Sequence, residues 1–188
     1  MSAQLRRPHA GLSLIEVMVA VLVLAIGLLG IAGLQAEALA NNLASYHYSQ
    51  ALTLAQALIE RMRANRQGVL EGHYLLPADQ LPPPPALDCG DSPAPCSPAQ
   101  QAHWDLAMVH AQLSTNAADV DAGAGLSSSG PGVLLPGGRL SVACEADCGS
   151  QDLRVVTLYW DAARSGATGT DCSGGRTQLH CLRLGYLP

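Results

Sequence analysis

The sequence has few charged residues and lacks the motifs of common catalytic sites. Lys and Arg together number 10 and Asp and Glu 15, which gives a net charge of −5 without a basic stripe. This balance argues against nucleic-acid binding as the main role. The sequence contains no Gly-x-x-x-x-Gly-Lys phosphate loop, no His-Glu-x-x-His zinc motif and no Gly-x-Ser-x-Gly nucleophile elbow. We therefore predict a protein that is not an enzyme and that holds neither a metal nor a cofactor.

Charge is missing altogether from residue 17 to residue 34, where Val, Leu, Ile, Ala and Gly fill every position except Met18. A helix of about 18 residues spans about 27 Å, close to the hydrocarbon thickness of a bilayer. A backbone in lipid has to satisfy its own hydrogen bonds, and a helix does so. The stretch therefore predicts one membrane-spanning helix.

Glu16 stands directly before this apolar run. A carboxylate at the mouth of a membrane helix is costly unless a positive group meets it, so Glu16 is a candidate functional residue with a missing partner. The residues before it are basic through Arg6 and Arg7, but an ordinary signal peptide is cut after its apolar region. Here the apolar run continues into helix-favouring sequence.

The heptapeptide Gly-Leu-Ser-Leu-Ile-Glu-Val at residues 11–17 resembles the type IV prepilin signature. The resemblance implies that prepilin peptidase removes a cytoplasmic leader, residues 1–11, by cutting between Gly11 and Leu12. The family usually begins its mature chain with Phe, whereas this sequence contains no Phe.

The new α-amino group of Leu12 would be cationic near neutral pH. Glu16 lies four residues away, so the two can pair within one helix. In the pilin family the pairing is instead thought to join neighbouring subunits and to set their stagger. The plainer alternative is a single-span anchor whose Glu16 only lies at the membrane interface.

Apolar residues continue at helical spacing beyond the membrane run. Three arginines precede Gly68, where positive charge suits the end of a helix and Gly is a plausible stop. We therefore predict one helix from Leu12 to about residue 67, with residues 12–35 as the membrane and assembly half and residues 36–67 as an amphipathic half. The apolar positions of the second half are Leu39, Leu43, Tyr46, Leu54, Leu58 and Met62.

Gly27, Gly30 and Gly33 recur at a spacing of three inside the apolar run. Small residues let helices approach closely, which is one interpretation. Each Gly also weakens a helix by about 1 kcal/mol in water, so the second interpretation is a segment that loosens easily. The third is that they are lipid-facing filler. Resemblance to the pilins favours the second.

Residues 68–188 are predicted to form a periplasmic globular head of the α+β class. Residues 68–97 are rich in proline and are expected to be an extended loop. Ser97, Pro98 and Gln100 have the pattern of a helix start. Strands are expected at residues 139–144, 153–160 and 178–184, as an antiparallel sheet with one face on the long helix.

Three short motifs narrow the resemblance. They are Arg-Met-Arg-Ala-Asn at residues 61–65, Leu-Pro-Gly-Gly at 135–138 and Val-Val-Thr-Leu-Tyr-Trp at 155–160. They are similar to elements of the PilV group of minor pilins, whose members resemble proteins that prime pilus assembly. The resemblance implies prepilin peptidase, other minor pilins, the major pilin and a tip adhesin as partners. It also implies residence in the inner membrane of a Gram-negative bacterium and then in a surface fibre.

The six cysteines all follow residue 88, and an even number suits disulfides in an oxidising compartment such as the periplasm. Pairs between cysteines close in sequence are the simplest of the possible connectivities. A four-thiolate zinc site made by the last four is the rival, but export favours oxidation. The local pairs are Cys89 with Cys96, Cys144 with Cys148, and Cys172 with Cys181.

Three functions are compatible with this sequence. The first is a minor pilin of a type IV pilus that promotes assembly and display of an adhesin. The second is a minor pseudopilin of a type II secretion system, which has the same architecture. The third is a membrane-anchored periplasmic binding module that never assembles. Whether the leader is removed, and whether deletion abolishes pili or protein secretion, separates the three.

Overall fold

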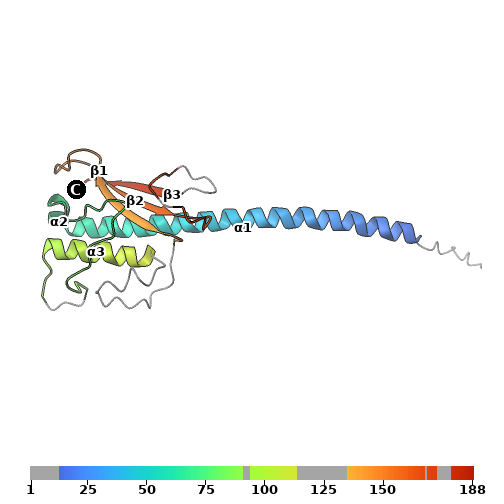
Figure 1. Cartoon of the computed structure of the whole chain (residues 1–188), viewed down its shortest axis with the longest axis horizontal. Coiled ribbons are helices and arrows are strands. Elements are labelled where there is room, and N and C mark those ends of the chain that lie inside the picture. Colours follow the sequence, from blue (N-terminus) through green and yellow to red (C-terminus); the bar gives the residue numbers. More distant parts are fainter. Residues whose placement is uncertain (1–12, 91–93, 114–134, 168, 173–178) are drawn as a thin grey trace, which may run out of the picture. The chain divides into compact units, whose positions relative to one another are not determined.

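The computed structural model describes residues 13–90, 94–113, 135–167, 169–172 and 179–188 (Figure 1). It divides into two compact units, Met1–Leu43 and Ala44–Pro188. Along the described chain three helices are followed by three strands. The predicted α+β, pilin-like class is therefore confirmed.

The long helix α1 runs from Leu14 to Ala64 without interruption and contributes to both units. Among the described residues it is the one helix that is long and apolar enough to cross a membrane, judged by length and composition. The uncharged stretch from which the sequence predicted a membrane helix, residues 17–34, lies in the N-terminal part of α1.

The predicted helix stop at Gly68 is wrong. α1 ends at Ala64, and Asn65 leaves the helical conformation with φ −111° and ψ 56°. A short helix, α2 (Arg66–Leu70), follows, and the Asn65 carboxamide oxygen accepts a hydrogen bond from the Gly68 N–H at 3.2 Å. Gly68 lies buried within α2, where an added Cβ would come within 2.9 Å of the Pro98 carbonyl oxygen. Glycine is needed at this position for a close approach between segments, not to end the helix.

Helix α3 (Pro98–Leu113) begins where the capping pattern predicted. The Ser97 hydroxyl accepts from the Gln100 N–H at 3.3 Å, and the Gln100 side chain accepts from the Ser97 N–H at 2.9 Å. This reciprocal pair is a capping box. The apolar face of this helix is buried, and Trp104 and Asp105 are buried with it; the apolar face consists of Ala102, Leu106, Val109 and Leu113.

The strands β1 (Arg139–Cys144), β2 (Arg154–Trp160) and β3 (His180–Tyr186) form an antiparallel sheet in the order β1-β2-β3. The bounds of β1 agree with the prediction and β2 begins one residue later. β3 extends two residues past the expected end, and Gln178 lies outside the described residues. Gly137 turns the chain into β1 with φ +58°, a conformation that favours glycine.

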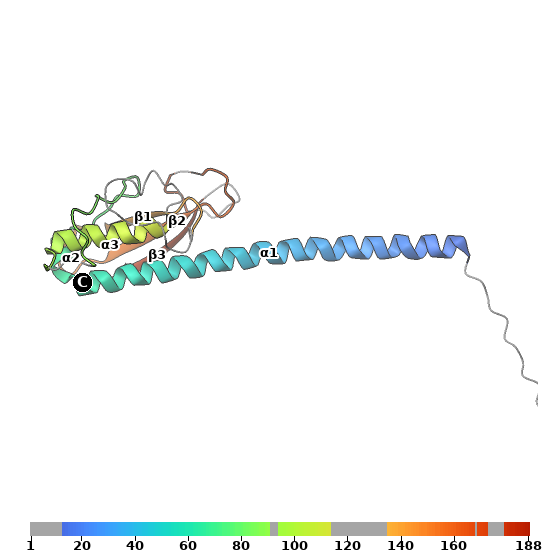
Figure 2. The same cartoon turned by 90° about the horizontal axis from the view of Figure 1, so that it is seen from below.

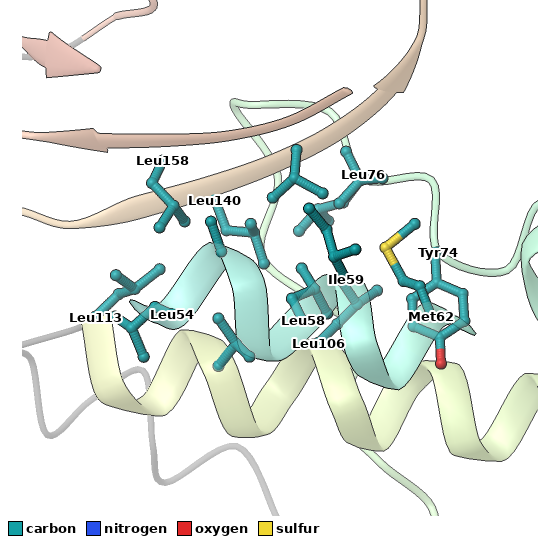
Figure 3. Close-up of a cluster of buried hydrophobic side chains, with 14 of the residues drawn as sticks. Leu54, Leu58, Ile59, Met62, Tyr74, Leu76, Leu106, Leu113, Leu140 and Leu158 are labelled. Atoms are coloured by element: carbon teal, nitrogen blue, oxygen red, sulfur yellow. The ribbon is translucent and has the colours of Figure 1, made fainter. Parts of the chain in front are cut away.

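The core of the head lies between one face of the sheet and the helices. α1 and α3 lie side by side on that face in both views (Figures 1 and 2). Leu140 of β1, Leu158 of β2 and Leu182 of β3 are aligned across the sheet, and Leu54 and Leu58 of α1 pack in the same cluster (Figure 3). The predicted contact of the sheet with the long helix is therefore present in the head.

The stripe predicted on the second half of α1 is only partly correct. Leu39, Leu43 and Tyr46 are exposed, whereas Leu54, Leu58 and Met62 are buried. Further α1 residues are buried that the prediction did not include, namely His47, Ala51, Ala55 and Ile59. The prediction had assigned this contact to larger apolar residues. Instead, the small side chains of Ala51 and Ala55 and the ring of His47 occupy part of it.

The expectation of an unbroken loop over residues 68–97 also needs correction. α2 extends to Leu70, and Leu76 forms an isolated antiparallel bridge with Val142 of β1, with both N–H to O distances 2.9 Å. The polyproline part, from Pro82 onward, has neither helix nor strand among its described residues.

Candidate assembly site

Glu16 lies in the first turn of α1, where the helix dipole favours a negative charge. The Glu16 backbone N–H donates to the Ser13 carbonyl oxygen at 3.0 Å, and Glu16 is exposed. Gly11 and Leu12, the predicted cleavage site, lie outside the described residues. The carboxylate is therefore available at the start of the apolar run, as the assembly hypothesis requires.

The side chains that follow Glu16 are exposed around the whole helix. Met18 is 60% exposed, Leu24 62% and Leu34 70%. Leaving so much contiguous apolar surface in water is unfavourable, and exposed patches of this size usually mark membrane or protein contacts. Lipid or other helices have to cover this part of α1.

Gly27, Gly30 and Gly33 lie within this exposed part. A Cβ added at any of them would meet no heavy atom within 4 Å. Contacts within the described chain therefore do not require glycine there. Close packing against another chain, a segment that loosens easily and lipid-facing filler all remain as interpretations.

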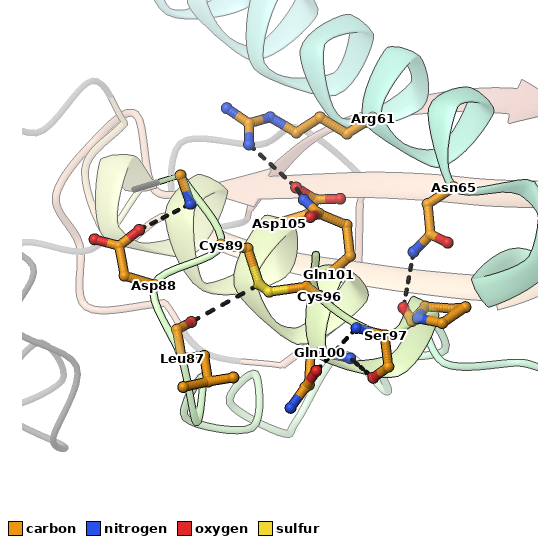
Figure 4. The surroundings of a disulfide bond; sticks show 12 residues. Arg61, Asn65, Leu87, Asp88, Cys89, Cys96, Ser97, Gln100, Gln101 and Asp105 are labelled. Carbon is orange, nitrogen blue, oxygen red and sulfur yellow. Dashed lines mark hydrogen bonds and ion pairs between the residues drawn. A yellow bond between two sulfur atoms is a disulfide. The ribbon is translucent and has the colours of Figure 1, made fainter. Parts of the chain in front are cut away.

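In the head, a polar junction centred on Asp105 joins the end of α1 to α3 (Figure 4). Asp105 is 1% exposed. Its carboxylate accepts hydrogen bonds from Arg61 at 3.1 Å and from Gln101 at 2.9 Å, both through Oδ1. A buried carboxylate is tolerated when it is paired and hydrogen-bonded in this way.

Tyr74 completes the junction. Its hydroxyl donates to Asp105 Oδ2 at 2.5 Å and accepts from the Asn65 side chain at 3.2 Å. Burial, and then the hydrogen bond to Asp105, raise the pKa of Tyr74 far above its ordinary value, so the phenol stays protonated as a donor. Asn65 also donates to the Pro98 carbonyl oxygen at 2.8 Å. Asn65, at the break after α1, therefore contacts α2, α3 and Tyr74 in the segment that follows α2.

An open groove of about 470 Å³ lies beside the junction, with about equal polar and apolar lining. Among the lining residues Asp105 and Gln101 are already hydrogen-bonded to each other, and Arg61 is bound to Asp105. The polar groups of the groove therefore serve the structure of the head. The groove is lined by Arg61, Ala64, Asn65, Cys96, Pro98, Gln101 and Asp105.

All six cysteines form disulfides, in the local pairs that the sequence suggested. The bonds join Cys89 to Cys96, Cys144 to Cys148 and Cys172 to Cys181. Each spans a loop rather than a pair of distant elements. The thiols that the zinc alternative required are therefore consumed in sulfur–sulfur bonds.

The loop between β1 and β2 is held by more than its disulfide. Arg154 is 2% exposed, and its guanidinium donates to the carbonyl oxygens of Cys148, Gly149 and Asp152 at 3.1 to 3.2 Å. The Asp152 carboxylate in turn accepts from the Gly149 N–H at 2.6 Å. Nothing in the local sequence distinguishes Arg154 from an exposed arginine, so this buried cation was not predicted.

A second buried polar site lies where α1 meets the end of the sheet. His47 is 7% exposed, and its Nδ1 has no hydrogen-bond partner among the described residues. Burial, then the charge of Arg164 and then His180, lower the pKa of His47 below its ordinary value. The His180 ring stacks on Trp160 with the ring centroids 5.8 Å apart.

The loop that presents Arg164 is organised by Asp161, which is 5% exposed. The Asp161 carboxylate accepts from the Ser165 hydroxyl at 3.2 Å and from the N–H groups of Gly166 and Ala167 at 2.7 and 3.3 Å. Burial by itself would raise the pKa of Asp161, but these hydrogen bonds outweigh it and lower the pKa. The carboxylate therefore stays ionised and occupied by its own loop.

Two family models match adjacent parts of the chain. One, described as the prokaryotic N-terminal methylation motif, matches residues 6–32. The other, described as type IV pilin Tt1218, matches residues 33–107. Together they take in α1, α2 and the first part of α3. No curated protein and no solved structure matches the chain.

Proposed function

We propose that this chain, which belongs to the type IV pilin superfamily, works as a minor pilin of a type IV pilus. The observation that carries the proposal is the placement of Glu16 in the first turn of a helix whose next part exposes apolar side chains on every face. The methylation motif covers the same residues. Superfamily members are structural pilins or pseudopilins rather than enzymes. The minor-pilin role is the more specific part of this proposal.

Processing comes first in the proposed sequence of events. Prepilin peptidase removes residues 1–11 on the cytoplasmic side of the inner membrane, and Leu12 becomes the N-terminal residue. Residues 12–35 hold the protein in the membrane, with residues 68–188 as a head in the periplasm of a Gram-negative bacterium. Three disulfides in the head suit this oxidising compartment.

Assembly then transfers α1 from lipid to a bundle of neighbouring pilin helices. Both environments cover the apolar surface that the chain leaves exposed, so the transfer does not require the helix to enter water. Within the bundle, Glu16 pairs with the N-terminal amine of a neighbouring subunit and fixes the stagger. Short motifs shared with the PilV group support a place beside other minor pilins, the major pilin and a tip adhesin.

The first experiment is the N-terminal sequence and intact mass of the membrane-extracted protein, with and without prepilin peptidase. A chain that begins at Leu12 only when the peptidase is present supports assembly. A chain that still begins at Met1 supports instead a membrane-anchored module that does not assemble. Deletion of the gene separates pilus from secretion system, through loss of surface pili or loss of protein secretion.

The role of Glu16 is tested by Glu16→Ala, with Glu37→Ala as the matched control. Both glutamates are exposed residues of α1, but only Glu16 lies in its first turn. We expect Glu16→Ala to remove the protein from sheared pili and from copurification with other minor pilins. Glu37→Ala should leave both unchanged. Normal incorporation of the Glu16→Ala variant would exclude the proposed pairing.

A further inference from the structure

The residues around His47 form a site that the assembly function does not use. His47 belongs to the first turns of the part of α1 that lies in the head unit. Arg164, in the loop after β2, and His180, at the start of β3, lie near enough to act on His47 electrostatically. On α1 itself the neighbouring ring is Tyr46, with its centroid 6.1 Å from that of His47. The charge of Arg164 therefore opposes a positive charge on His47.

A carboxylate does lie in the same loop as Arg164, but it is engaged elsewhere. The Asp161 carboxylate accepts hydrogen bonds from the Ser165 hydroxyl and from the N–H groups of Gly166 and Ala167. Its hydrogen bonds close the loop on itself. The Asp161 carboxylate of this loop is therefore already satisfied, while the Arg164 charge acts on His47.

The buried Nδ1 of His47 makes the site sensitive to protonation. In the neutral ring this nitrogen can be the unprotonated one and needs no acceptor. In the imidazolium it carries a proton, and no acceptor in the described structure reaches it. A buried donor without a partner is costly, and the charge of Arg164 adds repulsion.

We propose that His47 is a pH-responsive contact, and that its protonation at mildly acidic pH loosens the first head-bound turns of α1 from the end of the sheet. Histidine is the side chain whose charge ordinarily changes in this pH range. The core around Leu58 and the Asp105 junction lie further along α1 and hold the rest of the head together.

The direction of the effect follows from linkage. The docked state has the lower pKa for His47, so the undocked state binds the proton more readily. The stability that docking gains is fully present above the ordinary histidine pKa of about 6.5. It is lost as the pH falls from there through the pKa of the docked state.

Hydrogen–deuterium exchange on the full chain in detergent micelles tests this inference. Peptides covering residues 44–54 are compared between about pH 7.5 and pH 5, after correction for intrinsic exchange, with residues 98–113 of α3 as the internal reference. We expect exchange in residues 44–54 to accelerate severalfold relative to α3, because the undocked state binds the His47 proton more readily. Equal protection at both pH values would overturn the proposal.

His47→Gln removes the titrating ring and should abolish the acceleration, while His103→Gln on α3 should keep it. Arg164→Gln changes an exposed residue. It removes a positive charge that opposes protonation of docked His47, so the acceleration at about pH 5 should become smaller. If His47→Gln does not fold, Arg164→Gln decides alone, and an undiminished acceleration would overturn the proposal. The measurement uses the unassembled chain, so its outcome is independent of the minor-pilin role.

Discussion

The two parts of α1, before and after residue 43, differ in how their apolar side chains are covered. Leu24 in the first part is 62% exposed, whereas Leu58 in the second is fully buried. Both are leucines in one continuous helix. The first part is the more apolar, yet the chain supplies nothing that covers it among the described residues. Burial along the described part of this helix therefore follows the available partner rather than hydrophobicity.

The strongest test of this comparison pairs Leu58→Ala with Leu24→Ala. Leu58→Ala leaves a cavity in the core of the head and should lower its free energy of unfolding by about 3 kcal/mol. Leu24→Ala should leave unfolding of the head unchanged, because its side chain contacts no core. Denaturant titration in detergent, followed by Trp fluorescence, measures both. Equal losses would mean that the two parts of α1 do not differ as described.

The next effect concerns the polar junction of the head. Asp105→Ala removes the acceptor of the Tyr74 hydroxyl and of Arg61, and should cost about 2 kcal/mol of stability. The matched control is Glu60→Ala, which breaks the exposed pair of Glu60 with Arg63 at 2.5 Å on α1, the helix that also carries Arg61. Exposed pairs contribute little, so the control should unfold almost as the wild type does. A similar loss in both variants would assign Asp105 no special role.

The smallest effect is expected in the first part of α1. Gly30→Ala adds a methyl group into open space and should strengthen the helix by about 1 kcal/mol without changing unfolding of the head. Gly138→Ala provides the contrast in the head, since its Cβ would lie 2.8 Å from the Leu113 carbonyl oxygen and force a shift. Circular dichroism and denaturant titration follow the two responses. Destabilisation of the head by Gly30→Ala would show that this glycine has a contact within the chain.

Local signals predicted much of this fold. The capping pattern of Ser97 and Gln100 located the start of α3, and a run of strand-favouring residues bounded by Gly, Asp and Ser located β1 to its end residues. Such features depend on neighbours a few residues apart, which a sequence displays directly. The long helix was predicted for the same reason.

Contacts between distant residues were not predicted. Asp105 pairs with Arg61 across 44 positions, and the break at Asn65 depends on Tyr74 and on the Pro98 carbonyl oxygen. Each of these residues is ordinary in its own sequence surroundings. His47 does lie four residues before Ala51, in register with Leu54 and Leu58, so the corrected stripe was visible in the sequence. Choosing large apolar residues first placed the stripe on Tyr46 instead.

The disulfides have a consequence for the order of events in oxidative folding. Each cysteine is joined to the next one along the chain, over separations of 7, 4 and 9 residues. Loops of about this size close within about 10–100 ns in a flexible chain, far faster than a sheet forms. Each pair can therefore meet as soon as its second cysteine emerges, before β1 has found β2. The short separations therefore favour the native pairs over more distant ones while the head is still unfolded.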